Sequence, residues 1–112
     1  MSFSELQTEK SDCIKIIRNN VSTPDILDQL AEEAAELSHA ALKLARIKRG
    51  TNPTPVTEEE AVTSLVEELS DLWIITQHVL NIDPDETIVH RKLVRWKERI
   101  EEKNSRLKQG LQ

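Results

Sequence analysis

The chain has 112 residues, of which 38% are hydrophobic and 31% are charged, and it contains a single cysteine. This composition is typical of one globular domain and excludes a disordered polar chain and a disulfide-stapled fold. The net charge of −5 argues against binding to a nucleic-acid duplex. Neither a secretory leader pattern nor an apolar run of about 20 residues is present. We expect a single domain over residues 1–112, in the cytoplasm and without a membrane partner.

Four prolines and two glycines divide the chain into four predicted helices. The first is expected over Ser4–Asn19, where apolar residues recur at loosely helical spacing. The second is expected to begin with Thr23 as its N-cap and Pro24 at the first helical position, where a missing N–H group costs nothing. It should run to about Arg49, because Gly50 follows as a stop signal.

The third predicted helix begins with a capping box. Thr57 and Glu60 have the required spacing of three residues, and the helix should reach about Leu80. The apolar residues at helical spacing predict a core-facing stripe on the second and on the third helix. These stripes are Ile26, Leu30, Ala34, Leu37, Ala41 and Leu44 on the second, and Ala61, Leu65, Leu69, Leu72, Thr76 and Val79 on the third.

The fourth predicted helix repeats the same start signal, with Asp83 as cap, Pro84 at the first position and Glu86 as the reciprocal acid. It should run to about Leu107. No strand pattern interrupts the helices, so the sequence predicts an all-α, four-helix bundle-like fold.

Two helices carry paired carboxylates three residues apart, Glu33 with Glu36 and Glu68 with Asp71. At about 100° of rotation per residue, the first member of each pair lies about 60° from its apolar stripe, and the second lies about 60° further round. Like charges so placed repel each other unless a cation or protons intervene. Mg²⁺ takes carboxylate oxygens and completes its octahedron with waters and phosphates. The pattern therefore predicts a Mg²⁺ site between the two helices.

Residues 32–36, Glu-Glu-Ala-Ala-Glu, and residues 68–71, Glu-Leu-Ser-Asp, resemble the EExxE…ExxD signature of the MazG-like all-α NTP pyrophosphohydrolases. The resemblance covers about residues 24–100. It implies Mg²⁺-dependent hydrolysis of (deoxy)nucleoside triphosphates to nucleoside monophosphate and pyrophosphate, with Mn²⁺ as an alternative ion and nucleotide-pool housecleaning as the role. It also implies a homodimer or homotetramer in which a second subunit completes the helical bundle.

The resemblance assigns the acidic residues of the site. The implied metal ligands are Glu33, Glu36, Glu68 and Asp71, and Glu32 is the additional acid of the catalytic set. The linker between the two halves of the signature is longer than in compact members of the family, so the shape of the substrate mouth is not implied.

A triphosphate also needs cations beyond the metal. Lys43 lies on the same helix edge as Glu36, seven residues further on, and is a candidate phosphate contact. Lys92 and Arg95, with Arg99 behind them, occupy the region where the family carries a Lys/Arg cluster. We expect Lys43, Lys92 and Arg95 to bind substrate phosphates.

Two other functions fit the same helices. A non-catalytic adaptor or antitoxin-like dimer would use the acidic edges only for solubility. A di-iron carboxylate bundle would use Glu36 and His39 as a Glu-x-x-His unit, but the sequence lacks the second such unit.

Among the bulky side chains, Trp73 is expected in the core or a subunit interface and Trp96 in the core. An exposed Ile74 would indicate a subunit interface.

Overall fold

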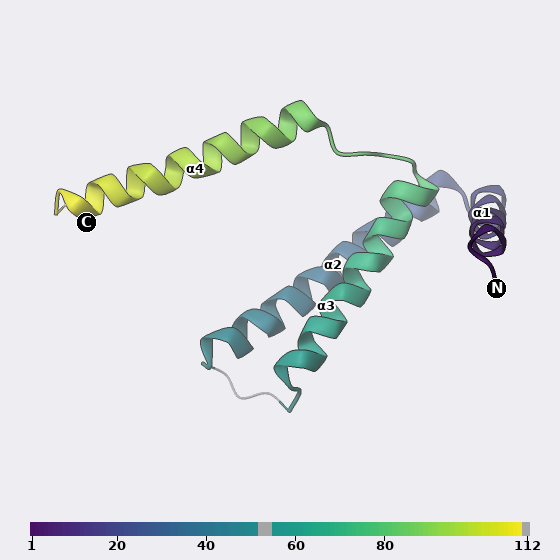
Figure 1. Cartoon of the computed structure of the whole chain (residues 1–112), viewed down its shortest axis with the longest axis horizontal. Helices are drawn as coiled ribbons and strands as arrows, with labels where there is room; N and C mark the ends of the chain where they lie inside the picture. Colours follow the sequence, from purple (N-terminus) through teal and green to yellow (C-terminus); the bar gives the residue numbers. More distant parts are fainter. Residues whose placement is uncertain (52–54, 111–112) are drawn as a thin grey trace. The chain divides into compact units, whose positions relative to one another are not determined.

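The computed structural model describes residues 1–51 and 55–110. In this part of the chain the elements are α1 (Phe3–Asn20), α2 (Thr23–Arg49), α3 (Glu58–Trp73), the π-helical segment η1 (Ile74–Val79) and α4 (Glu86–Lys108), with no strand (Figure 1). The all-α prediction is confirmed. The chain divides into two compact units, Met1–Ile82 and Asp83–Gln112. The single domain over residues 1–112 stays a prediction.

The start of α2 lies one residue earlier than predicted. Its N-cap is Ser22, whose hydroxyl accepts a hydrogen bond from the backbone N–H of Asp25 at 3.3 Å. Thr23 is therefore already helical, and the prediction that it caps the helix is wrong. Pro24 fits this register equally well, because none of the first four N–H groups of a helix has an intrahelical partner. The predicted end is correct, since Gly50 closes α2 with a left-handed φ of 67°.

The capping box of α3 is confirmed. The backbone N–H of Glu60 donates to Thr57 Oγ1 at 3.1 Å, and the N–H of Thr57 donates back to Glu60 Oε1 at 3.5 Å. For α4 the predicted cap is wrong, because Asp85 rather than Asp83 accepts a hydrogen bond from a free N–H group, that of Ile88, at 3.1 Å. Two candidate cap residues, Asp83 and Asp85, lie two residues apart here, and Asp85 is the one that caps the helix.

Helices α2 and α3 lie side by side and run in opposite directions, joined by the segment after Gly50 (Figure 1). The inward positions of both helices are buried or half-buried and alternate in steps of four and three residues, as in a coiled-coil seam. They are Ile26, Leu30, Glu33, Leu37, Ala40, Leu44 and Ile47 on α2, and Ala61, Leu65, Glu68, Leu72, Ile75 and Val79 on α3 and η1.

This seam corrects the predicted stripes. Ala34, Ala41 and Leu69 were expected to face the core, and all three are exposed. The predicted stripes followed apolar residues and therefore passed over two inward positions that carry glutamate. Glu33 and Glu68 do not border the seam but belong to it.

Helix α3 continues directly into the wider π-helical segment η1, and α1 packs against η1. Arg18 of α1 donates from Nε to the carbonyl oxygen of Val79 at 3.0 Å and from Nη2 to that of His78 at 2.6 Å. The carbonyl groups at a helix end lack intrahelical partners, so this guanidinium caps the end of η1. Thr76 Oγ1 donates to the carbonyl oxygen of Leu72 at 3.0 Å within the same region. Arg18 thus ties α1 to the hairpin.

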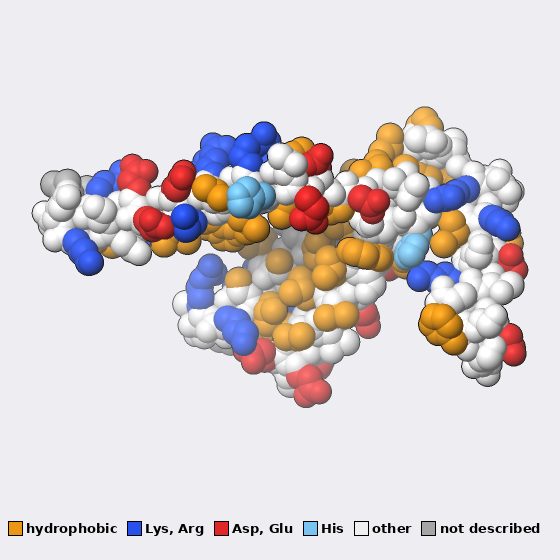
Figure 2. Space-filling model, turned by 45° about the horizontal axis from the view of Figure 1, so that its top comes forward, with side chains coloured by type: hydrophobic (Ala, Val, Ile, Leu, Met, Phe, Trp, Pro, Cys, Tyr) orange, Lys and Arg blue, Asp and Glu red, His pale blue; other side chains and the backbone are white. Residues whose placement is uncertain are grey.

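The buried core is very small. Among the described residues only Ile26, Ala61 and Ile75 are buried apolar residues, while many large apolar side chains are open to solvent (Figure 2). Trp96, expected in the core, is 65% exposed. The outward side of α3 and the start of η1 carry a run of exposed apolar residues that we call the outer face: Val62, Val66, Leu69, Trp73 and Ile74. Ile74 is exposed, which is the condition under which a subunit interface was expected there.

No helix in the described residues is both long and apolar enough to cross a membrane.

Candidate metal centre

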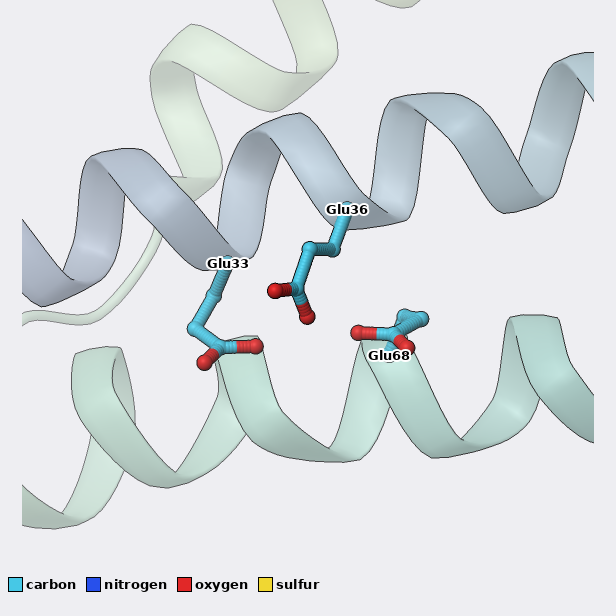
Figure 3. A group of neighbouring side chains, drawn as sticks. All are labelled: Glu33, Glu36 and Glu68. Carbon is cyan, nitrogen blue, oxygen red and sulfur yellow. The ribbon is translucent and has the colours of Figure 1, made fainter.

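Three carboxylates meet in the middle of the α2–α3 seam. Glu33 and Glu36 extend from α2 toward α3, and Glu68 extends from α3 toward them (Figure 3). One carboxylate oxygen of each residue lies within 4.8 Å of the corresponding oxygens of the other two. Glutamates from two antiparallel helices thus converge on one point, because the spacing of three residues brings Glu36 next to Glu33 on the same side of α2.

The seam shields part of this cluster from water. Glu33 and Glu68 are half-buried, and the Oε2 atom of each has almost no exposed surface and no hydrogen-bond partner among the described residues. The other oxygen of Glu33 accepts a hydrogen bond from Gln29 Nε2 at 2.7 Å. A carboxylate oxygen withdrawn from water without a partner costs free energy. Two such oxygens in one cluster therefore need a cation or a proton.

The protonation of Glu68 reflects this arrangement. Burial raises the pKa of Glu68 above its ordinary value of 4.5, and a hydrogen bond with the Glu36 carboxyl group raises it further. The negative charges of Glu36, Asp71 and Glu33 act in the same direction. Without a cation, Glu68 therefore holds its proton more tightly than an isolated glutamate would.

The donor set fits a hard divalent cation. Carboxylate oxygens are the ligands that Mg²⁺ prefers, and three of them leave positions for water and for phosphate oxygens. The two unpartnered oxygens of Glu33 and Glu68 are the atoms that such an ion would satisfy. Sulfur and imidazole ligands, which would favour a transition metal, are absent from the three-residue group.

Two predicted acidic residues lie outside the group. Asp71 is exposed and is not one of the three converging carboxylates, although its charge acts on Glu68. Its side chain is one methylene shorter than that of glutamate and starts one turn further along α3. Glu32 is also exposed. Their predicted roles, metal ligand for Asp71 and additional acid for Glu32, stay predictions.

A hollow of about 270 Å³ adjoins the cluster and is lined by Glu36, Glu68 and Lys43, together with Ser64 and His39. The structure thus brings the predicted phosphate contact Lys43 to the same hollow as two of the predicted ligands. An ammonium group at the edge of an acidic site is placed to attract a phosphate oxygen that a metal does not hold. His39 is exposed and also lines this hollow.

The remaining predicted cations are on α4. Lys92, Arg95 and Arg99 are exposed residues of that helix, which forms most of the second compact unit. Their contact with substrate phosphates stays a prediction.

Sequence reasoning missed Gln29 and Ser64. Gln29 precedes Glu33 by four residues on the same helix, a spacing at which side chains are neighbours, so its hydrogen bond could have been predicted. Ser64 reaches the hollow only because of the register between α2 and α3. No sequence signal marks it.

No protein-family model, curated protein or solved structure matches this chain. The resemblance to the MazG-like enzymes therefore stands on residues 32–36 and 68–71 alone. The function has to be argued from the site itself.

Proposed function

We propose that this chain is a Mg²⁺-dependent nucleoside triphosphate pyrophosphohydrolase that releases a nucleoside monophosphate and pyrophosphate. The observation that carries the proposal is the convergence of Glu33, Glu36 and Glu68, two of which have a shielded oxygen without a hydrogen-bond partner among the described residues. Acidic side chains are common on helix surfaces, but these carboxylates occupy or adjoin inward positions where leucine would stabilise the fold more. An arrangement of residues that lowers the stability of the chain without its ligand is typical of a functional site.

The hollow beside the cluster supports a phosphate-bearing substrate. Glu36 and Lys43 line it from α2, and Glu68 lines it from α3. A triphosphate carries several negative charges, so carboxylates alone would repel it. A Mg²⁺ ion held by Glu33, Glu36 and Glu68 would supply positive charge for the phosphates and would activate water for hydrolysis. Lys43, which lines the same hollow, would neutralise a phosphate oxygen.

The protein groups have separate parts in this reaction. Glu33, Glu36 and Glu68 hold and orient the ion, with Asp71 as the fourth ligand expected from the signature. Glu32 takes the proton of the attacking water, and Lys92 and Arg95 bind phosphate oxygens. No protein nucleophile is needed for a direct in-line attack.

We also propose that the protein acts as a homodimer or homotetramer. Only three apolar residues are buried in the described chain, whereas Leu69 is 51% exposed and Trp73 is 56% exposed on the outer face. Apolar surface of this extent is typical of an interface in an obligate assembly. A second copy presents the same outer face, so pairing two hairpins would give each a four-helix bundle core.

The exposed apolar face also favours one alternative, a non-catalytic adaptor that binds a different protein through α3. In that case Glu68 would hold a proton and the cluster would not bind an ion. The two functions differ in their response to Mg²⁺ and in turnover. No observation favours the di-iron bundle, because His39 is not a member of the three-carboxylate group.

The test is a substrate screen with the full chain. Common and damaged (deoxy)nucleoside triphosphates are incubated with Mg²⁺, and the products are identified by ion-exchange chromatography and ³¹P NMR. We expect equal amounts of nucleoside monophosphate and pyrophosphate from at least one triphosphate. Release of orthophosphate alone, or no turnover of any triphosphate, contradicts the proposal.

A matched pair of variants on α3 locates the activity. Glu68→Gln removes a member of the cluster, whereas Glu67→Gln removes the neighbouring exposed carboxylate. Mg²⁺ should raise the melting temperature of the unchanged chain and of Glu67→Gln, because an ion that binds only the folded state stabilises it. Glu68→Gln should lose both this rise and turnover. A chain with neither response to Mg²⁺ nor turnover would be the adaptor.

A further inference from the structure

A second hollow lies between α1 and η1, and it has a different chemical character. Its volume is about 380 Å³, and it is lined from α1 by Lys10, Lys15 and Arg18 and from η1 and the residue pair after it by Gln77, His78 and Asn81. It shares no lining residue with the hollow beside the carboxylate cluster. We call it the basic hollow.

The charge of the basic hollow is unbalanced. Of the described residues that line it, three are Lys or Arg and none is Asp or Glu. Within residues 1–51 and 55–110, the ion pairs do not include Lys10 or Lys15. Ammonium groups that share a concave surface without an opposite charge repel each other, and an anion relieves that repulsion. This is notable in a chain whose net charge is −5.

The walls of the basic hollow are held in place. Arg18 donates to the carbonyl oxygens of His78 and Val79, so α1 and the end of η1 are fixed to each other. Asn81 has a left-handed φ of 55°, which turns the chain back after η1 and places its amide at the hollow. Gln77 is held by a hydrogen bond of 3.0 Å from Nε2 to the carbonyl oxygen of Ile82. A preformed site loses less entropy when it binds a ligand.

We propose that the basic hollow binds a phosphate-bearing anion. Lys10 and Lys15 supply the charges, and the amide of Asn81 and the ring of His78 supply further polar contacts. Phosphate suits these groups because ammonium groups bind it as point charges from several directions. The ligand is either inorganic pyrophosphate or the phosphate chain of a nucleotide. This binding does not depend on the carboxylate cluster.

The test uses isothermal titration calorimetry of the full chain with inorganic pyrophosphate in EDTA. Without a divalent cation the carboxylate cluster repels the ligand, so any binding reports on another site. We expect binding by the unchanged chain and a loss of affinity of at least about tenfold in the double variant Lys10→Gln/Lys15→Gln, because charge-assisted hydrogen bonds are removed. ADP in place of pyrophosphate separates the two sources: equal affinities indicate recognition of phosphate alone, and tighter binding of ADP indicates a nucleotide.

Two controls make the result specific. Lys97→Gln/Lys103→Gln on α4 changes the net charge by the same amount and should leave the affinity unchanged, as should Lys43→Gln in the other hollow. Circular dichroism and the melting temperature check that each variant folds. The proposal is overturned if neither anion binds, if Lys10→Gln/Lys15→Gln binds as tightly as the unchanged chain, or if Lys43→Gln alone abolishes binding. These outcomes leave the Mg²⁺-dependent reaction untouched.

Discussion

The α2–α3 seam and the outer face of α3 reverse the usual distribution of side chains. The seam holds Glu33 and Glu68 at inward positions, while Leu69 and Trp73 point outward and are more than half exposed. Carboxylates inside and apolar side chains outside both raise the free energy of an isolated chain. A different kind of partner would therefore stabilise each region: a cation or a proton for the seam carboxylates, and an apolar surface for the outer face.

The largest expected effect comes from breaking the seam site. Glu36→Gln keeps the size of the side chain but removes a charge from the cluster. Because metal-assisted charge stabilisation contributes several kcal/mol, kcat/KM should fall by about 100-fold or more. Steady-state kinetics with the preferred triphosphate measure the loss. A similar loss in Glu67→Gln, outside the cluster, would show that charge in general rather than the site is responsible.

Breaking the outer face should affect assembly instead. Leu69→Lys places a charge in the proposed interface, and burying it without a partner should weaken self-association by about 100-fold. Analytical ultracentrifugation over a range of concentrations measures the change. Glu67→Lys, at an exposed position of the same helix that lines neither the basic hollow nor the hollow beside the cluster, is the control and should associate normally. If the unchanged chain is a monomer at all concentrations, the interface is wrong.

The pH dependence of the folded chain's stability tests whether Glu68 is destabilising at its inward position in the seam. Below pH 4.5 Glu68 is protonated in both the folded and the unfolded chain and makes no difference. As the pH rises past 4.5 the unfolded chain releases this proton first, because burial and the neighbouring carboxylates raise the pKa in the folded state. Stability should fall until the pH exceeds the raised pKa, and it should stay lower above it.

Melting temperatures in EDTA from pH 4 to pH 8 check this expectation. Glu68→Gln should remove most of the fall and melt higher than the unchanged chain at pH 8. Mg²⁺ should remove the difference by occupying the site in the unchanged chain. A fall of equal size in Glu68→Gln would assign the pH dependence to other groups.

The smallest expected effect comes from a residue outside both the α2–α3 seam and the outer face. Thr57→Ala removes the capping box of α3, and loss of such a cap costs about 1 kcal/mol. Urea unfolding should show this loss equally with and without Mg²⁺ and at all protein concentrations. A dependence on Mg²⁺ would mean that the start of α3 is coupled to the carboxylate cluster.

Local signals in the sequence predicted the helices well. The capping box at Thr57 and the stop at Gly50 are interactions within a few residues, so their geometry is readable without a fold. Where two cap residues competed, at Ser22 against Thr23 and at Asp85 against Asp83, the sequence favoured the wrong one. The π-helical register of η1 was not predicted, because no local pattern distinguishes it from the α-helix before it.

The candidate site, like the helices, was predicted from the sequence only in part. The spacing of Glu33, Glu36 and Glu68 was enough to predict that carboxylates from two helices meet, because helical periodicity fixes which residues share a side. The burial of these side chains was not predicted, because it depends on the register of the seam. That register places Glu33 and Glu68 at inward positions and leaves Asp71 outside the group.

The sequence by itself therefore determined the four helices and the acidic pairs, since both depend on contacts between near neighbours in the chain. Only the tertiary structure decided which oxygens lose their water, that Lys43 borders the same hollow as Glu36, and that Lys10 and Lys15 face His78 across another. These features depend on how α1, α2 and α3 pack. Packing joins residues that lie far apart in the chain, and no short-range pattern encodes its register.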